Sequence, residues 1–312
     1  MTAPIVFVGK STESAELWLA RFREELPDEV VLNHPDISDP ASVDVAIVAG
    51  PPPGILARFP QLKRVASLWA GVDAMLGDPS FPKGVVLSRL VDPVMTRWMV
   101  ETAVVHTLSF HRELPDYRLQ QAEARWYQRP ARRPEHRTVG VLGLGELGLS
   151  VVRALQGFHL DVQGWSRSPK RLADLVTHAG RDGLRALVQR SDILINLLPL
   201  TEGTRGILNA ELFGWMQSGS ALINLARGGH CVEADLLAAL DAGRPRWAAL
   251  DVTAVEPLPA DHPFWHHPQV ILTPHVAALS DEDSAARLVA EEIRRWRRGE
   301  PPLQPVDLSA GY

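Results

Sequence analysis

A chain of 312 residues is long enough for two α/β domains or one large one. Its net charge of −5 is mild, and lysine and arginine form no block that could follow a phosphate backbone, so nucleic acid is not an expected partner. Cys231 is the only cysteine, which excludes an intrachain disulfide and a cysteine-rich metal site and favours a reducing cytoplasm. The first apolar run, residues 5–8, is too short for a signal peptide or a membrane span, so no membrane association is expected.

The first third of the chain alternates short apolar runs with segments of helical periodicity. Strands are predicted at residues 5–8, 43–48, 64–69 and 85–87, a helix at 15–26, and a loop at the proline-rich residues 51–54. Continuous apolar strands are typical of a parallel sheet that is covered on both faces. The pattern therefore predicts a doubly wound α/β domain over residues 1–98.

A long, mostly apolar helical pattern at about 94–114 and a polar connector at 120–137 follow, and we place the domain boundary at this helix, with 99–137 as linking helix and connector. Further strands are predicted at 138–142, 161–165, 192–198, 221–225, 247–252 and 270–273. A full dinucleotide-binding sheet has six strands separated by helices, and we expect such a sheet within residues 99–280. The last helix is expected to begin at Ser280, whose hydroxyl would cap the amide near Asp283, and to end at about Arg298.

A glycine-rich pattern, G-x-G-x-x-G, lies between the strand at 138–142 and a helical segment. Gly143 would allow the tight turn, Gly145 would let the backbone approach a pyrophosphate, and Gly148 would let the helix pack on the strand. An ordinary glycine-rich turn is the alternative. The predicted pyrophosphate-binding turn of NAD(P) comprises Gly143, Leu144, Gly145, Glu146, Leu147 and Gly148.

The choice of cofactor depends on the end of the next strand, where an acidic residue normally binds the ribose hydroxyls of NAD. This chain has Ser166, Arg167 and Ser168 there. A hydroxyl and a guanidinium suit a 2′-phosphate, which a carboxylate would repel. The sequence therefore favours NADP(H), with NAD(H) possible; the alternative is that Arg167 is a solvated loop residue.

Three further segments, residues 221–229, 250–258 and 272–277, contain Arg227, Glu256 and His275. With residues 198–206 they resemble the signature of the D-isomer-specific 2-hydroxyacid dehydrogenases, and the resemblance covers most of residues 60–280. Within this family the chain is most similar to the glyoxylate/hydroxypyruvate reductase A branch, including its length and its terminal Gly311-Tyr312.

The resemblance implies a two-domain α/β fold with a cleft between two doubly wound parallel-sheet domains. A flavodoxin-like substrate domain would comprise residues 1–98, completed by the C-terminal helix in 281–312. A Rossmann NAD(P)-binding domain would comprise residues 99–280. The resemblance also implies a homodimer formed through the dinucleotide domains.

The chemistry of the reaction explains why an arginine, a carboxylate and a histidine are needed. Hydride transfer to C2 of a 2-oxo acid leaves negative charge on the carbonyl oxygen, which must be protonated. By resemblance, His275 is the acid, Glu256 stabilises and orients the imidazolium, and Arg227 binds the substrate. Taken singly, each residue has a structural alternative: Arg227 could support a turn, Glu256 could be a surface carboxylate, and His275 could be a packing histidine.

The resemblance also implies which residues surround the cofactor and the substrate. Asp251 would accept from the nicotinamide carboxamide, and the residues expected to contact the cofactor are Leu198, Pro199, Thr204, Leu225 and Ala226. The substrate carboxylate would bind backbone amides of the loop containing Trp69, Ala70, Gly71 and Val72. Trp69 stands where the family more often has glycine; the indole would either narrow the cleft toward two- and three-carbon acids or turn away and pack.

No metal site is expected, because His262, His266 and His267 have no further ligand at a suitable spacing. The expected function is NADPH-dependent reduction of short 2-oxo acids, glyoxylate to glycolate and hydroxypyruvate to D-glycerate, with His275 as the general acid. Two alternatives stay open: a reductase of another 2-oxo acid in the same family, and a non-catalytic regulatory protein that senses the dinucleotide.

Overall fold

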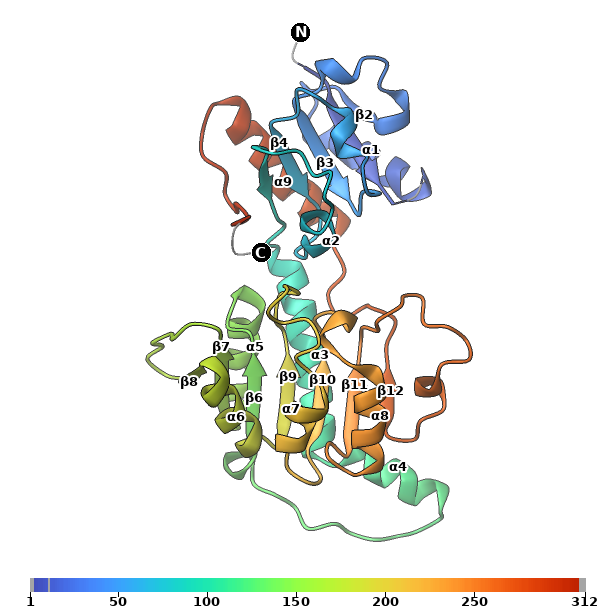
Figure 1. The fold of residues 1–312 in the computed structure, drawn as a ribbon, viewed down its shortest axis with the longest axis vertical. Helices are drawn as coiled ribbons and strands as arrows, with labels where there is room; N and C mark the ends of the chain where they lie inside the picture. Colours follow the sequence, from blue (N-terminus) through green and yellow to red (C-terminus); the bar gives the residue numbers. More distant parts are fainter. Residues whose placement is uncertain (1–2, 11, 309–312) are drawn as a thin grey trace. The chain divides into compact units, whose positions relative to one another are not determined.

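The computed structural model describes residues 3–10 and 12–308, which fold as two compact units, each built on its own parallel sheet (Figure 1). The first unit comprises residues up to 95 together with those from Ser280 onward, and the second comprises Thr96–Leu279. Gly311 and Tyr312 lie outside the described residues. None of the helices in the described part of the chain is both long and apolar enough to span a bilayer.

The first unit has five parallel strands in the order β2-β1-β3-β4-β5, which is the flavodoxin-like order. The strands are β1 (Ile5–Gly9), β2 (Val31–Asn33), β3 (Val45–Ala49), β4 (Arg64–Ser67) and β5 (Val86–Ser88), and the helices are α1 (Thr12–Glu25), α2 (Asp73–Leu76) and α9 (Glu282–Arg297). β1 pairs with β3 over five residues, and β3 is buried along its whole length because both sheet faces are covered. The sequence pattern did not predict the three-residue edge strand β2.

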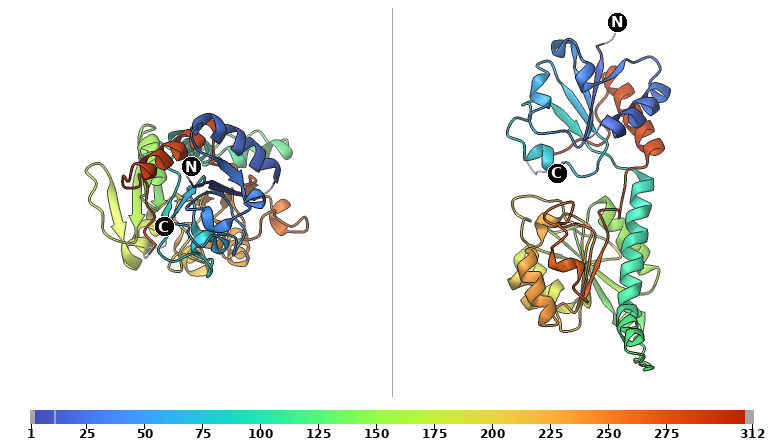
Figure 2. Two further views of the ribbon diagram at one scale, coloured as in Figure 1. Left: turned by 90° about the horizontal axis from the view of Figure 1, so that it is seen from above. Right: turned by 90° about the vertical axis from the view of Figure 1, so that its right-hand side faces the viewer.

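The C-terminal helix α9 belongs to the first unit, where it packs against α1 and β4 (Figure 2). Arg297, in its last turn, forms ion pairs with Glu29 at 2.9 Å and Asp44 at 3.2 Å. The predicted Ser280 cap is wrong: Asp281 is the N-cap, and its side chain accepts from the Ser284 amide at 2.9 Å. A carboxylate at N-cap satisfies the unpaired amides of the first turn, while the Ser280 hydroxyl donates instead to the Leu68 carbonyl.

The second unit has seven parallel strands in the order β12-β11-β10-β9-β6-β7-β8. They are β6 (Thr138–Leu142), β7 (Asp161–Ser166), β8 (Val176–Ala179), β9 (Ile193–Asn196), β10 (Ala221–Asn224), β11 (Trp247–Leu250) and β12 (Val270–Leu272). The helices are α3 (Pro93–His111), α4 (Leu114–Ala122), α5 (Glu146–Gln156), α6 (Gly180–Arg190), α7 (Ala210–Trp215) and α8 (Glu233–Asp241). The strand order reverses between β6 and β9, the position where open α/β sheets bind ligands.

Alternating residues of the strands build two cores, one on each face of this sheet. Ile193 and Ile195 pack in one core with side chains of α3 and α5, whereas Leu194 packs in the other with side chains of α6, α7 and α8. Helices therefore cover both faces (Figure 1), and the central strands β9 and β10 are buried along their whole length.

The predicted count of six strands in this sheet is wrong, because β8 was missed. β8 is the third strand of the 3-2-1-4-5-6 dinucleotide-binding order, and β12 is an additional seventh strand. β8 pairs with β7 alone, none of its residues is buried, and Val176 is 57% exposed. An exposed edge strand needs no apolar run, so hydrophobic patterning does not reveal it.

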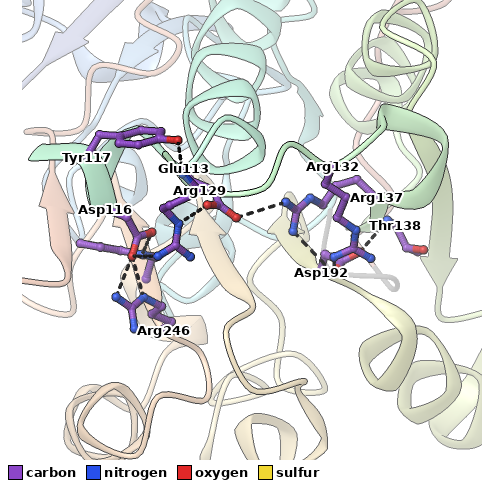
Figure 3. Close-up of polar contacts among 10 residues, drawn as sticks. Glu113, Asp116, Tyr117, Arg129, Arg132, Arg137, Thr138, Asp192 and Arg246 are labelled. Carbon is purple, nitrogen blue, oxygen red and sulfur yellow. Dashed lines mark hydrogen bonds and ion pairs between the residues drawn. The ribbon is translucent and has the colours of Figure 1, made fainter. Parts of the chain in front are cut away.

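The long helix predicted at about 94–114 is confirmed as α3, and a second helix that was not predicted, α4, follows it. α3 ends at His111, and Glu113 adopts a left-handed conformation with φ 57° before α4 begins. An ionic cluster ties α4 and the connector after it to the amino ends of the strands (Figure 3): Arg132 of the connector contacts Asp192 at 2.6 Å, and Asp116 of α4 contacts Arg246 at 2.6 Å. The amino-edge cluster consists of Glu113, Asp116, Arg129, Arg132, Arg137, Asp192 and Arg246.

Candidate functional site

The predicted site residues of the second unit follow the carboxyl ends of its strands. The glycine loop follows β6, Ser166 ends β7, and the loop with Leu198 follows β9. Arg227 follows β10, Asp251 follows β11, and His275 comes shortly after β12. Because all these strands are parallel, their carboxyl ends form one edge of the sheet, opposite to the amino-edge cluster.

The glycine loop has the geometry of a pyrophosphate cradle. Gly143 has φ +98°, and a Cβ there would lie 2.6 Å from the Leu197 carbonyl oxygen. A Cβ at Gly148 would lie 1.8 Å from the Gly143 carbonyl oxygen, whereas a Cβ at Gly145 would have no heavy atom within 4 Å. α5 begins at Glu146, and the amides of a first helical turn have no partner within the helix. The residues present therefore fit a dinucleotide pyrophosphate at the helix N-terminus.

The end of β7 carries positive charge and no carboxylate. The Ser166 hydroxyl donates to the Ser168 carbonyl at 2.8 Å, so its proton stays within the turn, and Arg167 and Ser168 are exposed. Lys170 lies close by, because its ammonium donates to the carbonyl of Leu144 in the glycine loop at 2.7 Å. Lys170 was not among the predicted site residues, although its position three residues after Arg167 is a signal in the sequence.

Arg227 stands on a turn fixed by buried asparagines. Its guanidinium donates to the Ala226 carbonyl at 2.7 Å. Asn224 accepts from the Ala226 amide at 3.3 Å and donates to the Arg227 carbonyl at 3.2 Å, and Asn196 donates to Asn224 at 2.9 Å. Both asparagines are fully buried, at the ends of β9 and β10. The sequence analysis missed this pair, whose importance depends on which strands are neighbours.

His275 and Glu256 form a direct pair. Nδ1 of His275 lies 2.7 Å from Oε2 of Glu256, and the other carboxylate oxygen accepts from the Thr253 amide at 3.1 Å. The side chains are 47% and 39% exposed in this unit. With Nδ1 on the carboxylate, the chemistry of the ring is directed through Nε2. The pair thus has the arrangement of a general acid and its orienting group.

Asp251 shapes the turn that carries His275. Its buried carboxylate accepts from the Thr273 hydroxyl at 2.6 Å and from the amides of Val276 and Ala277 at 2.9 Å. The His275 amide donates to the Asp251 carbonyl at 2.8 Å. Oδ1 receives two of these bonds and Oδ2 one, so Oδ2 retains capacity for another donor. The sequence analysis did not foresee this structural role.

The predicted carboxylate-binding loop lies after β4 in the first unit. Within the described residues, the amides of Ala70, Gly71 and Val72 have no acceptor at hydrogen-bond distance. Three successive unpaired amides suit an anion. The Trp69 indole lies over Gly50, where a Cβ would come within 2.1 Å of the ring, and it remains 39% exposed. The ring therefore packs on the backbone of its own unit.

Comparisons with known proteins identify the family of the chain. A family model described as "D-isomer specific 2-hydroxyacid dehydrogenase, NAD binding domain" matches residues 104–277. The chain is 41% identical over 305 residues to a glyoxylate/hydroxypyruvate reductase A of Serratia proteamaculans, covering 96% of this chain and 97% of that protein. It is also 41% identical to the protein of the same name from Photorhabdus laumondii, covering 99% of both.

Solved structures give the same likeness. A D-isomer specific 2-hydroxyacid dehydrogenase of Xanthobacter autotrophicus in complex with NADPH is similar over all of both chains, with a TM-score of 0.93 and 37% identity. An NADPH-dependent glyoxylate/hydroxypyruvate reductase of Sinorhizobium meliloti, in complex with NADP and sulfate, is similar over 99% of this chain and 100% of its own, with a TM-score of 0.91 and 36% identity.

Proposed function

Because the chain belongs to the D-isomer-specific 2-hydroxyacid dehydrogenase family and is an NAD(P)-dependent oxidoreductase, we propose that it reduces short 2-oxo acids with NADPH. The proposed substrates are glyoxylate, reduced to glycolate, and hydroxypyruvate, reduced to D-glycerate. The observation that carries the proposal is the His275–Glu256 pair, 2.7 Å apart, at the sheet edge that also holds the glycine loop. The curated relatives bear the name of this activity.

In the proposed mechanism, the bound dinucleotide supplies the hydride, which adds to C2 of the oxo acid. His275 donates the proton from Nε2 to the former carbonyl oxygen, and Glu256 stabilises the imidazolium before that transfer. The substrate gains one hydride and one proton and leaves as a 2-hydroxy acid. The ring is then reprotonated from solvent, which its exposure permits.

Two groups are proposed to hold the oxo acid. Arg227 binds its carboxylate or carbonyl oxygen through charge-assisted hydrogen bonds. The amides of Ala70, Gly71 and Val72 bind the carboxylate, which is supported by their lack of acceptors within the described residues. Trp69 borders this loop and is proposed to favour short acids; a Trp69→Gly variant with an unchanged chain-length preference would exclude that role.

The preference for NADPH is proposed from the charge at the end of β7. Arg167, Lys170 and Arg171 are the cationic residues of this segment, and a 2′-phosphate supplies the anion that NAD lacks. The relatives crystallised with NADPH or NADP support this choice. Asp251 is proposed to accept from the nicotinamide carboxamide through Oδ2, and the hydrophobic walls come from Leu198, Pro199, Leu225 and Ala226, beside Thr204.

We also propose that the protein is a cytoplasmic homodimer. The single cysteine supports a reducing compartment. The connector of the second unit, at residues 123–133, exposes Trp126 fully and Tyr127 to 56%, and large aromatic side chains are enriched at protein interfaces. The dimer is therefore proposed to form through the second units.

A kinetic panel of glyoxylate, hydroxypyruvate and longer 2-oxo acids with both cofactors tests the proposal. The expected result is NADPH oxidation that is fastest for the two- and three-carbon acids, with a higher kcat/KM for NADPH than for NADH. A higher kcat/KM for NADH would exclude the cofactor preference. If the protein binds NADPH but no short 2-oxo acid oxidises it, the alternative function, a regulatory dinucleotide sensor, would be favoured over an enzyme.

A further inference from the structure

His230 is a fully buried histidine between two loops of the candidate site. Its Nδ1 lies 3.2 Å from the Arg227 carbonyl oxygen, and its Nε2 lies 3.2 Å from the Pro199 carbonyl oxygen. Pro199 belongs to the loop after β9, and Arg227 belongs to the turn after β10. The two ring nitrogens therefore face carbonyl oxygens of two different loops, and because a carbonyl oxygen only accepts, each contact is a hydrogen bond when the ring nitrogen that faces it carries a proton.

These loops have different proposed roles. Pro199 lies in the loop proposed to contact the nicotinamide end of the cofactor, and Arg227 is the proposed substrate-binding residue. Each loop is anchored within itself, since Thr204 donates to the Pro199 carbonyl at 2.7 Å and Asn224 donates to the Arg227 carbonyl at 3.2 Å. The His230 side chain joins one loop to the other.

Burial gives this link weight. A ring with no exposed surface cannot replace a lost hydrogen bond with one to solvent, so the loops must stay within its reach. If the ring were absent, Pro199 would lose its link to the Arg227 turn, and the two segments would be joined only further along the chain, by the backbone bonds from Gly206 to Gly229 at 3.0 Å and from Leu208 to His230 at 2.9 Å. A displacement of about 1 Å between reacting groups is enough to reduce a rate by about a hundredfold.

We propose that His230 is a positioning residue that holds the cofactor-contacting loop and the substrate-contacting turn at a fixed separation. The role rests on the proposed function of Pro199 and Arg227. In this role, one buried side chain keeps the hydride donor aligned with the oxo acid. His230 itself touches neither.

Three variants separate the two contacts. In His230→Asn the amide stands near the former Nδ1 and keeps the contact with Arg227, but it is too short to reach Pro199. In His230→Gln the amide stands near the former Nε2 and keeps the contact with Pro199 instead. His230→Leu removes both while filling similar volume. His136→Gln, an exposed histidine at the amino edge of the same sheet, is the control.

We measure NADPH affinity by fluorescence titration, kcat and KM for glyoxylate, the isotope effect with NADPH deuterated at the transferred position, and the thermal midpoint. His230→Asn is expected to weaken NADPH binding severalfold with little change in the KM for glyoxylate. His230→Gln is expected to raise that KM and lower kcat by about tenfold with nearly native NADPH affinity. His230→Leu is expected to show both changes and a larger isotope effect, because misaligned hydride transfer limits the rate.

A purely structural histidine gives another pattern. The proposal is overturned if the Asn and Gln variants have the same kinetic constants and affinities as each other. It is also overturned if folded His230→Leu loses thermal stability but keeps the native kcat, KM and isotope effect. If the native protein binds NADPH but reduces no 2-oxo acid, the proposed function fails separately. The NADPH affinities of the Asn and Gln variants then decide the role of His230, and equal affinities reject it.

Discussion

At the scale of single residues, the backbone around His275 matters as much as its ring. The residue has φ 55°, a left-handed conformation that a side chain adopts at some energetic expense. Asp251 stabilises this conformation by accepting from the amides of Val276 and Ala277 on one side and from the Thr273 hydroxyl on the other. The turn thereby presents the ring to Glu256 without requiring glycine.

His275→Gln is expected to remove the acid and leave the turn intact. Glutamine is similar in size but cannot release a proton at neutral pH, so kcat should fall by about 10²- to 10⁴-fold, the usual contribution of a general acid. NADPH affinity, measured by fluorescence titration, should stay native. Glu256→Gln should lower kcat less, because it weakens the stabilisation of the imidazolium without removing it. A His275→Gln enzyme with nearly native kcat would remove this residue from the mechanism.

Cys231, next to His230, is expected to be inert in the native protein. Burial, followed by the negative charges of Glu233 and Asp235, raises the pKa of its thiol to about 12 from 9.0. At pH 8 the native thiol should react slowly with Ellman's reagent, and one equivalent should react in denaturant. Because the unfolded thiol ionises first, its contribution to stability is lost as the pH rises from about 9 toward 12. Fast labelling of the folded protein would contradict this burial.

At the scale of elements, two glycines of the glycine loop are expected to have different roles: Gly148 in the packing of α5 and Gly145 in the binding of the dinucleotide. A Cβ at Gly148 would meet the Gly143 carbonyl oxygen at 1.8 Å, whereas a Cβ at Gly145 would enter open space. Gly148→Ala should therefore lower the thermal midpoint, because α5 must move away from the loop. Gly145→Ala should keep a native midpoint but raise the dissociation constant of NADPH, because the methyl group occupies the proposed cradle. Equal thermal midpoints for the two variants would show that the packing tolerates both.

The sequence pattern reveals most clearly the strands whose side chains are all buried. The strands β6, β9, β10 and β11 are buried on both faces, so an unbroken apolar run is enough to reveal them. β8 is an exposed edge strand, and its backbone pairing with β7 is a tertiary fact that patterning does not contain. The same reason applies to the cap of α9: the sequence pattern favours Ser280, but the tertiary contact of its hydroxyl with the Leu68 carbonyl leaves Asp281 as the N-cap.

At the scale of the whole molecule, the sequence revealed the residues proposed to do chemistry and missed those that place them. Arg227, Glu256 and His275 each lie in a recognisable motif, and the structure confirms that Glu256 and His275 are in contact. Asn196 and His230 act through neighbours that are distant in sequence, since their partners follow adjacent strands. To predict such contacts one must know the order of the strands in the sheet, which composition and periodicity do not specify.

At the scale of the whole molecule, the exposed aromatic side chains of the connector are the observation behind the proposed homodimer. Arg129 and Arg132 anchor it to the amino-edge cluster, which makes it an ordered segment rather than a free loop (Figure 3). Between α4 and these anchors, Trp126 is fully exposed. Holding an indole in water on an anchored segment is unfavourable, and burial of a large aromatic side chain is worth about 1.5–3 kcal/mol or more. A second copy of the chain is the proposed occupant.

Removal of the two aromatic side chains should therefore weaken self-association. Light scattering after size exclusion is expected to give a dimer for the native protein and a larger monomer fraction at micromolar concentration for Trp126→Ala combined with Tyr127→Ala. Leu17→Ala is the control, because Leu17 is 57% exposed on α1 of the first unit, which contains no part of the connector. A native protein that is monomeric at high concentration would contradict the homodimer. A double variant that stays fully dimeric would exclude the connector as the main contact, since burial of its aromatic side chains would then contribute little to association.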